Sequence, residues 1–203
     1  MLASGHQVLG FTFGLIAVTV MQTFGIVPVH TLDIVLFFVF VLFGSLLPDI
    51  DTPTSRLGSK FWRMLILFFF VTLLVYLFFP DLLDTYREDL KIFVVLMIPI
   101  LVMIRGHRKM THSLLFLAVL FLYSTIIVEG LGVPWFFMYG LLAGALSHFV
   151  GDFVTKKGIP LFYPLSKRYY RFFFTFRTGS LTERGIVIAL MIWNVWYLVK
   201  EIF

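Results

Sequence analysis

The chain has 203 residues, of which 60% are hydrophobic and only 13% are charged, and its mean hydropathy is +0.99. A soluble domain carries about 25% charged residues, so this composition excludes a soluble globular protein. The charge balance is basic, with 16 Lys and Arg against 11 Asp and Glu. Cysteine is absent, which excludes disulfides and thiolate metal sites and leaves His and carboxylate side chains as metal ligands.

The apolar runs predict an all-α, polytopic membrane helical bundle of about seven spans, in a single domain over residues 1–203. Several runs approach the roughly 20 residues that cross a hydrocarbon core. The fourth run is short and contains Pro99, which predicts a kinked or partly shielded helix. The first run lacks a basic leading segment and a cleavage site, so it is expected to be retained. In chain order the expected spans are residues 7–27, 34–47, 61–79, 92–104, 114–128, 134–149 and 185–199.

The stretch of residues 145–171 gives the clearest signal of a functional site. His148 and Asp152 stand four residues apart at the end of an apolar run, so a helix would project both from one face, one turn apart. Polar side chains at the edge of a membrane span are costly unless they are paired or functional. A basic loop with Gly158 and Pro164 follows, where anionic groups can be held beside a metal.

A chain that alternates sides with each of seven crossings places seven His and Asp residues, far apart in the sequence, at one membrane face. That face also receives 13 of the 16 basic residues. Because Lys and Arg accumulate in cytoplasmic loops, the site is expected at the cytoplasmic end of the bundle. The candidate metal ligands on this face are His6, Asp49, Asp51, His107, His112, His148 and Asp152.

The chemistry of these ligands points to metal-dependent hydrolysis. Imidazole and carboxylate groups bind zinc, manganese and iron(II), and this set suffices for two divalent ions, with zinc favoured. Two ions sharing a carboxylate can activate water and clamp the attacking and leaving oxygens of a phosphoester. The predicted catalytic residues are Asp51, His112, Arg108 and Arg168. The residues expected to neutralise the substrate phosphate are Arg108, Lys157, Arg168 and Arg171.

Simpler interpretations exist for individual residues. His6 alone fits a polar cap at the membrane surface, and Asp49 with Asp51 fits loop acids that pair with nearby bases. The basic run at residues 105–109 is typical of a cytoplasmic anchor on anionic headgroups. For the whole chain, the alternatives to a hydrolase are a metal-ion transporter and a noncatalytic membrane scaffold. Clustering at one end argues against a transporter, whose sites usually lie near the bilayer midplane.

Three sequence segments carry a resemblance to a known family. They are LLPDIDTP, GHRKMTHS and HFVGDFVTKKGIPLFYPLSKR, and they resemble the LexA-regulated, inner-membrane-associated, YdjM-like family described as metal-dependent hydrolases. The resemblance implies a multi-pass protein of a prokaryotic inner membrane with a His and Asp metal site. It is similar in ligand style to zinc-dependent phospholipase C enzymes. Together with the basic site at headgroup depth, it predicts a lipid phosphoester substrate and no nucleic-acid partner.

Overall fold

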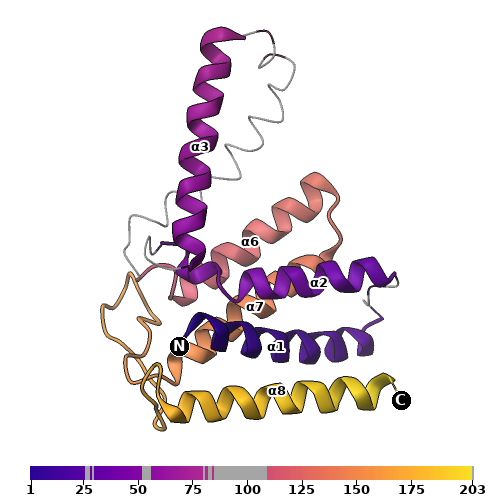
Figure 1. The fold of residues 1–203 in the computed structure, drawn as a ribbon, viewed down its shortest axis with the longest axis vertical. Helices are drawn as coiled ribbons and strands as arrows, with labels where there is room; N and C mark the ends of the chain where they lie inside the picture. The colour runs from indigo at the N-terminus through magenta and orange to yellow at the C-terminus, as the bar shows by residue number, and fades with distance from the viewer. Residues whose placement is uncertain are drawn as a thin grey trace. The chain divides into compact units, whose positions relative to one another are not determined.

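The computed structural model describes residues 1–25, 28, 30–51, 56–79, 81, 84 and 109–202. These residues form helices and connecting loops, which confirms the predicted all-α class (Figure 1). In chain order the helices are α1 (Ala3–Thr23), α2 (Thr31–Gly44), the 3-10 helix η1 (Leu47–Asp51), α3 (Arg56–Phe78), α6 (Leu114–Leu131), α7 (Trp135–Phe153) and α8 (Leu181–Ile202).

Five of the described helices, α1, α3, α6, α7 and α8, are long and apolar enough to cross a membrane. This is fewer than the seven expected spans. The helix α2 has 14 residues, and at 1.5 Å per residue it covers only about 21 Å of a hydrocarbon core of roughly 30 Å. The span expected at residues 92–104 lies outside the described residues.

The chain divides into two compact units, one formed by Met1–Pro48 with His112–Phe203 and the other by Asp49–Thr111. The described part of the second unit consists mainly of the apolar helix α3. The first unit contains α1, α2, α6, α7 and α8, and four of the seven predicted metal ligands belong to it.

Helix α7 occupies the centre of the first unit, where it packs against α1, α2 and α6. Helix α1 also contacts α2 and α8. Because successive helices of this unit run in opposite directions, the starts of α1, α6 and α8 lie at the same end as the last turns of α2 and α7 (Figure 1). Residues near these five helix ends are therefore brought together although they are far apart in the sequence.

Two glycines let the backbones of α2 and α7 touch. A Cβ atom at Gly144 would lie 2.0 Å from the carbonyl oxygen of Val41, and one at Gly44 would lie 2.2 Å from that of Leu141. Any larger residue would collide with backbone, and small residues are the usual means of close helix approach in membranes. This contact holds the end of α2 against the turn of α7 that carries His148.

The basic loop between α7 and α8 has a defined backbone. A parallel bridge joins Thr155 to Phe176, and an antiparallel bridge joins Ile159 to Tyr170. Gly158 adopts a φ of +68°, and a Cβ atom there would lie 2.3 Å from the Tyr170 carbonyl oxygen. Glycine is thus required at this turn both by backbone conformation and by space.

Candidate metal centre

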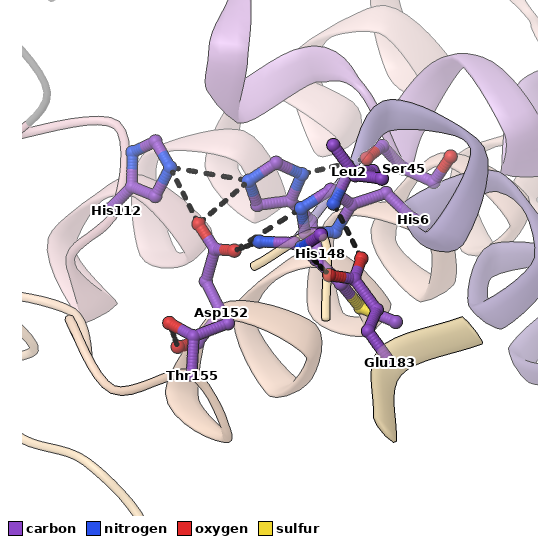
Figure 2. A network of polar contacts seen from close by, with 10 residues as sticks. Leu2, His6, Ser45, His112, His148, Asp152, Thr155 and Glu183 are labelled. Atoms are coloured by element: carbon purple, nitrogen blue, oxygen red, sulfur yellow. Dashed lines mark hydrogen bonds and ion pairs between the residues drawn. The ribbon is translucent and has the colours of Figure 1, made fainter. Parts of the chain in front are cut away.

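Four of the predicted ligands meet at the shared helix end of the first unit (Figure 2). His6 lies in the first turns of α1, His112 lies just before α6, and His148 and Asp152 lie one turn apart on α7. The three histidines are 1%, 6% and 0% exposed, respectively. The structure brings these four residues together, since each histidine Nε2 atom lies within 3.6 Å of an Asp152 carboxylate oxygen.

Three ligand atoms form a nearly equilateral triangle. His112 Nε2 lies 3.2 Å from His148 Nε2, and Asp152 Oδ2 lies 3.5 Å and 3.6 Å from these two atoms, respectively. Ligands about 2.0–2.1 Å from a tetrahedral zinc ion are separated from one another by roughly 3.3–3.4 Å. The spacing and the chemistry of this donor set therefore fit a divalent ion bound by two imidazoles and one carboxylate.

The backbone directly after α2 determines which nitrogen of the neutral His148 ring carries the hydrogen. His148 Nδ1 lies 2.8 Å from the carbonyl oxygen of Ser45, and a carbonyl can only accept, so Nδ1 carries the hydrogen. In the neutral ring, Nε2 then carries no hydrogen, and its lone pair faces His112 and Asp152. A metal-binding histidine is typically held this way, with its other nitrogen donating to a carbonyl or carboxylate.

His6 approaches Asp152 from the other side. Its Nε2 atom lies 3.2 Å from Asp152 Oδ1, and its ring stacks on that of His148 with centroids 3.8 Å apart and an interplanar angle of 8°. The Met1 amino group is 2.5 Å from the same Oδ1 atom. Each oxygen of Asp152 thus faces a different set of nitrogen atoms, the arrangement of a carboxylate that can bridge two ions.

The position of His6 depends on the absence of a side chain at residue 151. A Cβ atom at Gly151 would lie 3.1 Å from His6 Nδ1, closer than an unstrained contact permits. Nδ1 is buried and, among the described residues, has no hydrogen-bond partner. A glycine one residue before Asp152 therefore provides the room in which the His6 ring lies against α7.

Glu183 is a buried acid that sequence analysis missed. Its side chain is 1% exposed and accepts the backbone N–H of Leu2 at 2.7 Å and that of Gly179 at 2.6 Å. It thereby ties the start of α8 to Leu2, which directly precedes α1 and lies four residues before His6. The available signal was the Ser-x-x-Glu pattern at Ser180, which is typical of a helix N-terminus.

The remaining predicted site residues fall into three groups. Asp49 and Asp51 lie on η1 within the second unit, and their participation stays a prediction. His107 and Arg108 lie outside the described residues. The basic residues Lys157, Arg168 and Arg171 are exposed on the loop after α7.

Both loop arginines contact the loop itself. Arg168 lies over the Tyr170 ring, 5.8 Å from its centroid, and Arg171 Nη1 donates to the Lys156 carbonyl oxygen at 3.2 Å. Neither contact involves the His and Asp cluster. A role of these arginines at a substrate phosphate therefore stays a prediction.

Comparison with known proteins confirms the family resemblance. The family model described as YdjM inner membrane protein matches residues 1–202. Over 94 residues, 45% of this chain, the sequence is 38% identical to the inner membrane protein YdjM of Escherichia coli (strain K12) and to that of Shigella flexneri, covering 47% of each. Over 92 residues it is 32% identical to a Bacillus subtilis (strain 168) protein named uncharacterized protein YvsG, covering 54% of it. The chain thus spans about half the length of these curated relatives, and no solved structure matches it.

Proposed function

This chain belongs to the YdjM inner membrane protein family, and from that premise we propose that it is a metal-dependent hydrolase. The proposed reaction is the cleavage of a lipid phosphoester by water at the cytoplasmic surface of the inner membrane. Water adds to phosphorus, the ester P–O bond breaks, and the leaving alcohol oxygen takes up a proton. The proposed substrate is a phospholipid or another lipid phosphate.

One observation carries the metal site. In the neutral His148 ring, Nδ1 donates to the Ser45 carbonyl oxygen and Nε2 carries an unshared lone pair, yet Nε2 faces Asp152 Oδ2 at 3.6 Å. A lone pair and a carboxylate oxygen repel each other in a buried site. The single hydrogen available on His112 Nε2 can point to only one of these two acceptors. A divalent cation among the three atoms would satisfy all of them at once.

The proposed ligands follow from this geometry. His112, His148 and Asp152 Oδ2 would hold the first ion, and His6 with Asp152 Oδ1 would contribute to a second. Asp49, Asp51 and His107 are the predicted candidates for the positions that these residues leave open. When bound, such ions lower the pKa of water toward neutrality and stabilise charge on a phosphoryl group.

The position of the cluster favours hydrolysis over ion transport. The four residues lie at the ends of membrane-length helices, whereas transporter sites usually lie near the midplane. The exposed bases on the loop after α7 also suit an anionic substrate, because charge-assisted hydrogen bonds to phosphate strengthen as negative charge develops. A transported cation would gain nothing from neighbouring Arg and Lys side chains.

The metal part of the proposal is tested by replacing its ligands. We expect His148→Ala and Asp152→Asn to lose most bound metal, measured by elemental analysis of the purified protein after equilibration with zinc. His30→Ala is the matched control, because His30 is an exposed histidine that precedes α2 at the other end of the first unit. Full metal content in both ligand variants would place the site elsewhere.

The catalytic part is tested separately with Arg168→Ala. This variant should keep its metal yet lose lipid phosphoester turnover by about 10²-fold, the scale of removing one donor to a developing oxyanion. The assay is release of phosphate or a phosphorylated headgroup from detergent-solubilised bacterial lipids. Turnover that persists with a chelator would refute the metal mechanism. Zinc movement across proteoliposomes that requires His148, without any lipid cleavage, would establish transport instead.

A further inference from the structure

An apolar groove opens on the first unit beside the basic loop. It has a volume of about 480 Å³ and is lined by side chains from α1, α7, α8 and the segment 172–176. Leu190 on α8 lies nine residues beyond the first residue of that helix, so the groove extends about 13 Å along the helix from its end. The main apolar lining residues are Leu9, Val150, Val154, Phe172, Phe174 and Ile186.

Two cations from separate parts of the loop lie beside the walls of this groove. Lys156 lies two residues after the lining residue Val154, and Arg171 directly precedes the lining residue Phe172. Arg171 Nη1 donates to the Lys156 carbonyl oxygen at 3.2 Å, and the Phe172 N–H donates to the Phe153 carbonyl oxygen at 2.9 Å. The loop therefore brings residues 15 positions apart to one place and leaves both charged side chains exposed.

The acids that flank this region are already engaged. The sequence has no Asp or Glu between Asp152 and Glu183. Asp152 contacts the three buried histidines, and Glu183 accepts two backbone N–H groups. No carboxylate of this stretch competes for the Lys156 and Arg171 side chains, so the loop carries net positive charge next to the segments that line the groove.

We propose that the groove and this cation pair bind one anionic phospholipid. An acyl chain would lie among Val150, Val154 and Ile186, and the headgroup phosphate would lie against Lys156 and Arg171. Three helices long enough to span a membrane contribute to the groove walls. In a membrane, such a groove would face lipid, so an acyl chain is the proposed occupant. The basic loop selects a headgroup with net negative charge over a zwitterionic one.

The exposed aromatic residues support a membrane environment for this surface. Phe173 and Phe174 are 76% and 74% exposed, and their rings pack against each other with centroids 4.5 Å apart. Exposed apolar side chains that lie together are typical of a surface that contacts a membrane or another protein. The inference concerns binding alone and does not depend on whether the bound lipid is cleaved.

Native mass spectrometry of the detergent-purified chain tests this site with dioleoyl phosphatidylglycerol and dioleoyl phosphatidylcholine. We expect one tightly retained phosphatidylglycerol and weaker retention of phosphatidylcholine. Lys156→Gln and Arg171→Gln should each weaken phosphatidylglycerol binding about 5-fold, and the double variant about 30-fold. Lys167→Gln is the matched control, because Lys167 is an exposed base of the same loop with no groove-lining residue within two positions of it in the sequence.

A second pair of variants addresses the acyl chain. Val154→Trp and Ile186→Trp each add bulk inside the groove and should weaken binding of both lipids, while the unfolding temperature identifies any variant that fails to fold. Asp152→Asn should lose metal but retain phosphatidylglycerol, which separates this site from the proposed hydrolase. Equal binding of the two lipids, or an equal loss in Lys167→Gln and in the double variant, would refute the inference.

Discussion

Replacing Gly144 with alanine should disrupt the proposed metal centre without changing any of its proposed ligands. The new Cβ atom would lie 2.0 Å from the Val41 carbonyl oxygen and 2.7 Å from the Ser45 backbone nitrogen. Both neighbours are backbone atoms, so the only relief is separation of α2 from α7. An ordinary carbon to oxygen contact of about 3.3 Å requires the helices to move apart by about 1.3 Å.

That movement would break the hydrogen bond that orients His148. Its 2.8 Å separation from the Ser45 carbonyl oxygen would grow to about 4 Å, beyond hydrogen-bonding range. Loss of such an outer partner typically costs 10- to 100-fold in metal affinity. The overpacking itself should lower the free energy of unfolding by about 1–3 kcal/mol.

Zinc titration with a competing chelator measures the affinity, and thermal unfolding in detergent measures the stability. Gly185→Ala is the matched control, because a Cβ atom there would meet nothing within 4 Å. It should bind zinc normally. Wild-type zinc affinity in a folded Gly144→Ala protein would show that the contact between α2 and α7 does not orient the site.

Two further predictions concern α1 and the membrane orientation. Glu183→Gln should lower the free energy of unfolding by about 1–3 kcal/mol and reduce the metal content. The amide oxygen can replace only one of the two carboxylate oxygens as an acceptor, and the NH₂ group would face the other backbone N–H. Glu129→Gln, at an exposed glutamate, is the control for both measurements. The native chain lacks cysteine, so single cysteines can be labelled with an impermeant maleimide. Leu165→Cys should react with the maleimide only after the cells are permeabilised, because the loop after α7 is expected on the cytoplasmic side. Leu131→Cys should react in intact cells. Labelling of both cysteines from the same side would contradict the predicted orientation.

The helices and part of the site could be predicted because they depend on local patterns. Apolar runs predicted α1, α3, α6, α7 and α8 close to their observed bounds. The spacing of His148 and Asp152 predicted their shared face on α7. The prediction that His6 and His112 lie near them required one further assumption, that successive helices run in opposite directions. This assumption holds for the helices of the first unit.

Other features could not be predicted because they depend on contacts between distant backbones. Every residue has a backbone carbonyl, so the sequence does not identify that of Ser45 as a partner of His148. It becomes one only because Gly44 and Gly144 let α2 and α7 touch. Likewise, Lys156 and Arg171 are ordinary loop bases until the bridges around Gly158 bring them together. Such pairings are fixed by packing, which residue type alone does not encode.

The placement of Asp152 explains why a single carboxylate can organise a site assembled from three helices. As the residue just before the end of α7, it has one oxygen toward His112 and His148 and the other toward His6. Asp152→Asn would keep one oxygen as an acceptor but would turn an NH₂ group either toward His112 and His148 or toward His6. If Asp152 bridges two ions, this variant should therefore lose both, whereas His6→Ala should lose only the second. Equal metal loss in the two variants would instead indicate that one ion is shared by all four residues.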